Sequence, residues 1–237
     1  MRALIRRRYP SSRRLPDVLA IVILSGCVLV GALALGGGVE AAAAQPVPIE
    51  SCGTDITNPG KYNITEDLDS AGIDVCINIE ASDVVLDGRN YTIAHSGSGR
   101  GTVGIVVGPQ EDRLLAQAGG PISNVTIRNV TLIGQRSNGI ELAHVTEVTL
   151  IEANVSDNRY SGINDMHVRD EITDRNITRT NATLIDVVAN NNGGTDEEGV
   201  IPAFGIAIGG NANFSGVTAN DNTAGGIEID RNATGTG

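Results

Sequence analysis

Short segments of alternating apolar and polar residues run through most of the chain. In SDVVLDGRNYTI, residues 82–93, the alternation breaks at Asp87-Gly88 and then resumes. An apolar residue at every second position predicts β-strands with one buried face. We therefore expect short strands of about three to five residues, separated by Asn and Gly.

The alternating segment recurs, so it is one unit of a repeat and not an isolated hairpin. Related segments begin at residues 123, 146, 182 and 213, and each is followed by a second segment that opens on Gly-Ile. The repeat glycines are Gly104, Gly139, Gly162, Gly205 and Gly226. The shorter spacings between them give a unit of about 22 residues, and the longer spacings contain insertions.

A unit of this length cannot bury its apolar face alone. Stacking of successive units buries that face continuously and pairs each strand with the equivalent strand of the next unit. The pattern thus predicts an all-β solenoid of about five coils. We also expect asparagines at one corner of each coil, where they tolerate a left-handed backbone and stack their amides. These are Asn129, Asn154, Asn190 and Asn220.

Residues 1–44 have the pattern of an export segment. Arginines precede an apolar run from Val18 to Leu35, and AAAAQ follows it. This order is typical of a signal peptide. Cleavage near Ala44, an uncleaved membrane anchor and lipidation at Cys27 are the alternatives. All three carry the rest of the chain across the membrane, so we expect a secreted or cell-surface protein whose only membrane contact is through residues 18–35.

Two cysteines, Cys52 and Cys76, follow the export segment. A cysteine pair near the start of an exported domain predicts a disulfide, because oxidising compartments favour the bond. It would close a loop where a stack of repeats needs a cap. The chain then divides into three parts. They are a signal or anchor at 1–44, an N-terminal cap with the first strands at 45–78, and the repeats at 79–237.

The exported part is strongly acidic. It has 11 basic and 26 acidic residues, a net charge of −15, and its only lysine is Lys61. Such a surface is typical of a protein from high salt, where screening weakens self-repulsion. An ordinary acidic secreted protein is the alternative. The charge argues against a nucleic-acid partner, since nucleic acids bind basic surfaces.

The repeat period, the VVLDG motif at 84–88, the Gly-Ile segments and NPGKYNITEDL at 58–68 resemble the right-handed parallel β-helix repeat proteins. The likeness is greatest to secreted archaeal proteins with a NosD-type β-helix domain, within the wider group of carbohydrate-associated β-helix repeats. It covers roughly residues 49–237. The resemblance implies a right-handed parallel β-helix. It implies no single activity, because such repeats form a scaffold.

The motifs of β-helix enzymes are missing from the sequence. The polygalacturonase-like hydrolases need clustered aspartates and a His-Gly pair, and neither Asp-Asp nor His-Gly occurs here. Aromatic platforms for sugar rings are also few. We therefore expect a non-catalytic scaffold that presents loops to a ligand, a polysaccharide or a cell-envelope partner. A carbohydrate-active enzyme, either lyase or hydrolase, and a NosD-like copper-binding protein are the alternatives.

One group of residues suggests a metal site. His144 and His167 each lie five residues after a repeat glycine, so they are equivalent on successive coils. Asp165 lies three residues after its glycine, where the other repeats have apolar residues. An inward carboxylate is costly unless it is paired or bound to a cation. The group predicts a transition-metal site, with copper suggested by the resemblance. A solvent-facing histidine ladder, with Asp165 turned outward by a bulge, is the alternative.

Other surface expectations concern calcium, glycans and the outer face. The acidic segment at 196–198 could hold calcium or be a hydrated loop. Asn176 and Asn181, in a predicted loop, are the better glycan candidates among the N-x-Ser/Thr sequons. Three further residues are expected to point outward into solvent. They are Glu141, Asn164 and Glu228.

The last repeat reaches RNATGTG, residues 231–237, without a capping helix or polar turn. This indicates either a truncated chain or an end that a partner covers. End-to-end self-association through the C-terminal coil is therefore expected as one possible contact.

Overall fold

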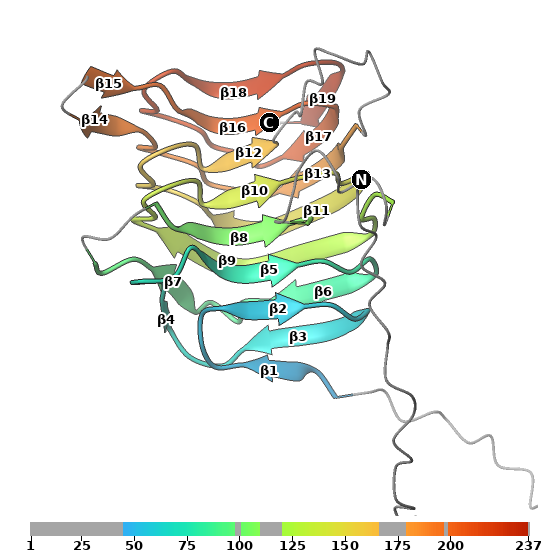
Figure 1. Ribbon diagram of the computed structural model, residues 1–237. Coiled ribbons are helices and arrows are strands. Elements are labelled where there is room, and N and C mark those ends of the chain that lie inside the picture. Colours follow the sequence, from blue (N-terminus) through green and yellow to red (C-terminus); the bar gives the residue numbers. More distant parts are fainter. Residues whose placement is uncertain (1–44, 98–100, 110–119, 166–178, 197–198, 237) are drawn as a thin grey trace, which may run out of the picture. The chain divides into compact units, whose positions relative to one another are not determined.

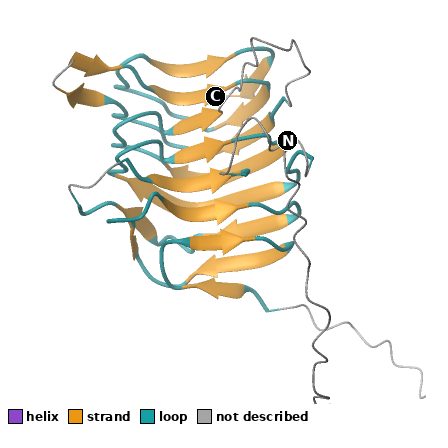
Figure 2. Ribbon diagram, in the orientation of Figure 1, coloured by secondary structure: helices purple, strands orange, loops and turns teal. Residues whose placement is uncertain are grey.

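The described part of the chain consists of β-strands and loops (Figures 1 and 2). The computed structural model describes residues 45–97, 101–109, 120–165, 179–196 and 199–236. Within these ranges there is no helix, and so none that is long and apolar enough to span a membrane. The all-β class is confirmed. Residues 1–44 lie outside the described ranges, so the export segment stays a prediction.

Sheet A is the larger of two long sheets, and its neighbouring strands are all parallel. Its order is β1-β3-β6-β9-β11-β13-β17-β19, with β4 pairing to β7 and β7 to β9. Its strands are β1 (Val47–Ile49), β3 (Gly60–Ile64), β4 (Leu68–Asp69), β6 (Val84–Asp87), β7 (Thr92–Ala94), β9 (Val125–Ile133), β11 (Glu147–Asn154), β13 (Asn181–Ile185), β17 (Asn211–Ser215) and β19 (Ala233–Thr236).

Sheet B is also parallel throughout, in the order β2-β5-β8-β10-β12-β16-β18. Its strands are β2 (Thr54–Ile56), β5 (Val75–Ile79), β8 (Val103–Val107), β10 (Ile140–Leu142), β12 (Ile163–Asp165), β16 (Phe204–Ile208) and β18 (Gly225–Ile229). The chain passes back and forth between the two sheets, and each pass adds one strand, except that β3 with β4 and β6 with β7 are successive strands of sheet A (Figure 1). This stacked arrangement is consistent with a solenoid.

An antiparallel hairpin interrupts the stack between β13 and β16. It pairs β14 (Gly194–Asp196) with β15 (Gly199–Ile201) and projects beside the two long sheets (Figure 1). The hairpin accounts for part of the longest interval between repeat glycines.

The Gly-Ile segments lie in register in sheet B, as predicted. Their isoleucines pair in the order Ile105, Ile140, Ile163, Ile206 and Ile227. The glycine before each of these isoleucines packs closely against neighbouring strands, as Gly162 shows. A Cβ on Gly162 would lie 2.6 Å from the carbonyl oxygen of Gly205 and 2.9 Å from Asn192 Nδ2. A side chain at this position would therefore push neighbouring strands apart.

Aliphatic side chains fill the space between the sheets. Leu150 and Leu184, which pair across β11 and β13, are both fully buried, as are Ile140 and Leu142 of β10. In most strands every second residue contributes to this core, because the side chains of a strand alternate between its two faces, whereas all four residues of β19 are exposed. The same alternation along the sequence predicted the strands.

The predicted asparagine corner is wrong in part. Asn190 and Asn220 are equivalent, and the N–H of Asn220 donates to Asn190 Oδ1 at 2.7 Å. Asn154, however, pairs with Val188, and Asn129 lies at another corner, where its backbone is left-handed with a φ of 51°. Similar neighbouring residues suggested one corner, but in the strand register Asn129 lies two residues before the Asn154 position, and Asn190 and Asn220 lie two residues after it.

A different set of asparagines forms a buried ladder. Asn158 Nδ2 donates to Asn192 Oδ1 at 3.2 Å, and Asn192 Nδ2 donates to Asn222 Oδ1 at 2.9 Å. The residues just before them, Asp157, Asn191 and Asp221, have left-handed φ values of 55° to 58°. The left-handed turn directs the next side chain inward. There its amide satisfies polar groups that would otherwise be buried without partners.

Candidate functional site

Asp165 occupies a core register position in sheet B, as the sequence predicted. It pairs with Leu142 of β10, whose side chain is fully buried. Asp165 is only half-buried, and its Oδ2 accepts a hydrogen bond from the backbone N–H of Gly209 at 2.9 Å. This bond offsets part of the cost of desolvating the carboxylate. The inward register of Asp165 therefore does not by itself require a bound cation.

Asp165 lines an open depression on sheet B, near the ends of β12, β16 and β18. Its volume is about 170 Å³. The lining residues are Asn164, Asp165, Ala207, Ile208, Gly209, Glu228 and Asp230. Three of these side chains are carboxylates and one is an amide, so the lining offers mainly hydrogen-bond acceptors.

The depression extends from the outward column of sheet B to the strand ends beside it, and small residues there separate larger ones. Asn164, Ala207 and Glu228 pair in register across the three strands and form one outward column. Ala207 leaves a gap between the longer side chains of Asn164 and Glu228. Gly209, which follows β16, adds no side chain to fill it. Glu228 and Asp230 are exposed, so they form the accessible side of the depression.

The structure tests the predicted metal group only in part. His144 lies at the corner after β10, half-buried and with a left-handed φ of 59°. Histidine is among the residues that tolerate this backbone better than most. His167 lies outside the described residues, so its position relative to His144 and Asp165 stays a prediction. Within the described ranges no three His, Cys, Asp or Glu side chains are grouped so as to hold a metal ion.

The prediction that Glu141 is solvated is wrong. Its register is outward, between Val106 and Asn164, but its exposed fraction is 4%. Val106 is also 4% exposed, so the outer face of sheet B is covered at this level. Glu141 Oε2 accepts a hydrogen bond from Asn138 Nδ2 at 3.3 Å. Asn164 is half-buried, and Glu228 is exposed as predicted.

Asn181, one of the two glycan candidates, is exposed at the start of β13. Its Oδ1 accepts a hydrogen bond from Asn211 Nδ2 at 2.9 Å, and Asn211 Oδ1 in turn accepts one from Asn232 Nδ2 at 3.3 Å. Asn181 thus lies on a strand and not in the predicted loop. Asn176 lies outside the described residues. So does most of the acidic segment proposed for calcium, of which only Asp196 ends β14.

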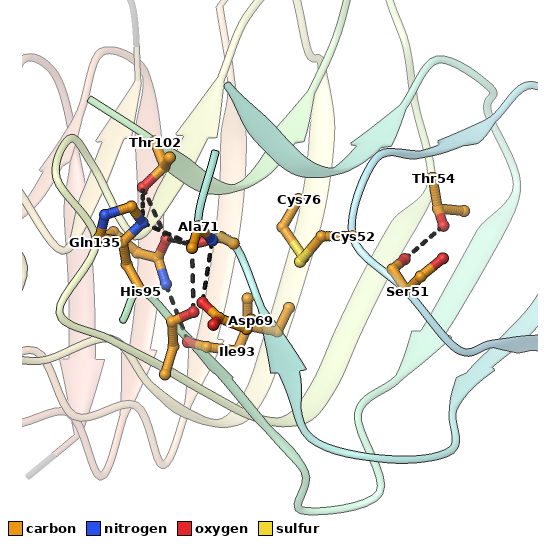
Figure 3. The surroundings of a disulfide bond; sticks show 12 residues. Ser51, Cys52, Thr54, Asp69, Ala71, Cys76, Ile93, His95, Thr102 and Gln135 are labelled. Carbon is orange, nitrogen blue, oxygen red and sulfur yellow. Dashed lines mark hydrogen bonds between the residues drawn. A yellow bond between two sulfur atoms is a disulfide. The ribbon is translucent and has the colours of Figure 1, made fainter. Parts of the chain in front are cut away.

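Cys52 and Cys76 form the disulfide that the sequence predicted (Figure 3). Cys76 is a fully buried residue of β5, and Cys52 precedes β2. The bond therefore ties the first strand of sheet B to the second. The N–H of Gly53 also donates to the carbonyl oxygen of Cys76 at 2.7 Å.

A polar cluster near the disulfide was not found from the sequence (Figure 3). Ser70 Oγ donates to Gln135 Oε1 at 2.9 Å, and Thr102 Oγ1 lies 3.2 Å from His95 Nδ1. The backbone N–H of Gln135 donates to Asn158 Oδ1, which joins the cluster to the asparagine ladder. The cluster is thus an extension of an internal hydrogen-bonded structure. Its members are far apart in sequence, so no local motif marked them.

One ion pair lies on the outer face of sheet A. Arg128 Nη2 is 2.8 Å from Asp87 Oδ2. Partial burial opposes ionisation of Asp87, but hydrogen bonds from Asn129 Nδ2 and the Arg89 N–H, together with the Arg128 guanidinium, outweigh it. The pKa of Asp87 is therefore held below its usual value.

No protein family, curated protein or solved structure matches this chain. The resemblance to NosD-type β-helix proteins therefore rests on the sequence motifs alone and stays a prediction.

Proposed function

We propose that the chain is an exported, non-catalytic right-handed parallel β-helix of about five repeat coils, and that the depression around Asp165 binds a carbohydrate. The alternation of the chain between two parallel sheets, with the Gly-Ile segments in register, supports the helix. The observation that carries the binding proposal is the depression itself, which three carboxylates and an amide line.

The lining favours a ligand that donates hydrogen bonds. Sugar hydroxyl groups do so, and hydrogen bonds to carboxylates are stronger than those between neutral groups. The negative charge of Asp165, Glu228 and Asp230 disfavours uronates and favours neutral or amino sugars. A volume of about 170 Å³ is below the range of about 300–1,000 Å³ for drug-sized ligands. The depression is therefore suited to one ring of a longer chain.

Calorimetry on the full chain tests this proposal. Neutral, amino-sugar and uronate oligosaccharides are titrated into the wild type, Asp165→Asn and Glu228→Gln. Asn at 165 keeps an acceptor for the Gly209 N–H, so the fold is preserved. We expect about a tenfold loss of affinity for the neutral or amino sugar in each variant, as for the loss of one charge-assisted hydrogen bond. Glu147→Gln, exposed on β11 of sheet A, is the matched control.

Equal affinity of all four proteins, or binding of uronates alone, would contradict the proposed site. N-terminal sequencing of the protein recovered from its own cells tests export separately, and a start near residue 45 would support cleavage.

A glycoside hydrolase is the second candidate, because such enzymes use a pair of carboxylic acids around the scissile bond and three carboxylates line this depression. Release of reducing ends from the same oligosaccharides would be the sign of turnover. If turnover were lost in Glu228→Gln while binding was retained, the protein would be a glycoside hydrolase and not a non-catalytic scaffold.

A further inference from the structure

The corner between β6 and β7 is longer than the matching corner of the next coil. Four residues, 88–91, separate these two strands, whereas two residues of β9, Asn129 and Val130, span the same register. Arg89 and Asn90 of this corner are both exposed. The two extra residues therefore lie at the surface of the corner and not in the core.

The longer corner forms a turn of defined conformation. Its central residues, Arg89 and Asn90, have left-handed φ values of 52° and 65°, as in a type I′ turn. The N–H of Tyr91 donates to the carbonyl oxygen of Gly88 at 2.8 Å, and the N–H of Asn90 donates to that of Asn129 at 2.8 Å. The backbone of Asn90 is thus held in place while its side chain lies at the surface.

Asn90 also begins an N-x-Ser/Thr sequon, NYT at 90–92, and seven other sequons lie wholly within the described residues. In six of the seven, the asparagine side chain makes a hydrogen bond. The six are Asn124, Asn129, Asn154, Asn181, Asn213 and Asn232. The seventh asparagine, Asn63, is half-buried in β3. Asn90 is exposed, and its side chain makes no hydrogen bond within the described ranges.

We propose that Asn90 is a site of N-linked glycosylation, in place of the Asn181 that the sequence favoured. The inference rests on the export that is part of the proposed function, since these sequons are modified in exported proteins. The sugar comes from a lipid-linked sugar phosphate. Asn90 Nδ2 bonds to C1 of the sugar, and the C1–O bond to the phosphate breaks. The lipid phosphate leaves with the electron pair of that bond, and the amide loses one proton.

The turn accommodates a glycan whether the sugar is added before or after folding. After folding, an enzyme can reach an amide on an exposed turn, whereas Asn181 lies on a strand that is paired on both sides, with β11 and β17. A sugar added before folding must still fit the folded chain, because a glycan is bulky and needs the surface. On Asn124 it would lie against Asp83, to which Nδ2 donates at 2.6 Å. On Asn90 it displaces no such contact.

Peptide mapping by mass spectrometry of the protein recovered from its own cells tests the proposal. Cleavage after Lys and Arg gives 90–100 for Asn90, and separate fragments, 62–89 and 114–128, for Asn63 and Asn124. We expect the 90–100 fragment to gain the mass of a glycan and the other two to keep the masses of their sequences. The cell fraction that contains the protein reports export separately.

Substitutions of the sequon hydroxyl assign the glycan without changing Asn90. Thr92 is half-buried in β7, and valine keeps its branched shape and suits a strand. We expect Thr92→Val to lose the glycan and Thr92→Ser, which keeps the sequon, to retain it. The matched control Thr183→Val removes the sequon of Asn181 from β13 and should keep the wild-type mass gain. Asn90→Asp, which tolerates the same backbone, should also be unmodified.

Unmodified Asn90 in protein recovered from the medium or the cell envelope would overturn this inference and leave the proposed export standing. Recovery of unmodified protein from the cytoplasm would contradict both. A glycan that persists in Thr92→Val, or one that is lost in Thr183→Val, would assign the modification to another asparagine and exclude Asn90.

Discussion

Sheets A and B each have a column of outward residues that pair in register from strand to strand, and the two columns differ in their surroundings. In sheet A the column is half-buried or exposed along its whole length. Its members are Val85, Thr126, Thr149, Thr183, Asn213 and Thr234. In sheet B the column starts at Asp55 of β2, which is exposed, and its next three residues, Asn78, Val106 and Glu141, are each 4% exposed or less. The exposure of the column then increases, since Asn164 and Ala207 are half-buried and Glu228 is exposed.

This difference shows that the outer faces of the two sheets are not equivalent, although both are built from the same repeat. The outward column of sheet A stays in one environment, half-buried or exposed, and four of its six members named above are threonine. The outer face of sheet B is covered at β5, β8 and β10 and opens at β12, where the candidate depression begins. A ligand site on a repeat protein is expected where the environment changes, because the repeat itself specifies only the scaffold.

The largest expected effect comes from placing a charge on the covered face. Val106→Asp should lower the free energy of unfolding by about 3–5 kcal/mol, the cost of an unpaired buried charge. Thr149→Asp, at the outward position of β11 in sheet A, should change it by less than about 1 kcal/mol. Urea denaturation of both variants measures the difference. Equal destabilisation would mean that the two outer faces are not distinct.

Removal of the disulfide should have a somewhat smaller effect, concentrated in sheet B. The bond closes a loop over a sequence separation of 24, and loops of this size are stabilised by about 3 kcal/mol. In a Cys52→Ser, Cys76→Ser variant, β5 should lose amide hydrogen-exchange protection before β11 of sheet A does. Uniform loss of protection in both sheets would show that the bond stabilises the whole stack and not its first strands.

The smallest expected effect concerns acid and the ion pair on sheet A. The pKa of Asp87 in the folded chain is held below its unfolded value of about 3.9. Its carboxylate therefore stabilises the fold above about pH 4, and this contribution is lost as the pH falls through the folded pKa. Asp87→Asn should remove this part of the acid sensitivity at a cost of about 1 kcal/mol or less at neutral pH.

Denaturant midpoints for wild type and Asp87→Asn between pH 3 and pH 7 check the effect. The two curves should converge at the acidic end. A constant gap between them would contradict a role for ionised Asp87.

The candidate site was predicted in part, and the misses have physical causes. Asp165 was noticed because a carboxylate replaced the apolar residue that the repeat requires, and its register with Leu142 is as predicted. Asp230 and Gly209 were missed, since they follow their strands and have no marked place in the repeat. Glu141 was assigned to solvent because its register is outward, but the sequence period contains no information about what covers an outer face.

The sequence by itself determined the strands, the equivalence of the Gly-Ile segments and the cysteine pair. These follow from local chemistry: side chains of a strand alternate between its faces, and only glycine leaves room for the neighbouring carbonyl at positions such as Gly162. The tertiary structure decided which asparagines stack and which outer face is covered. Those properties depend on contacts between residues far apart in the chain, such as Asn158 with Asn192 and Asp165 with Gly209.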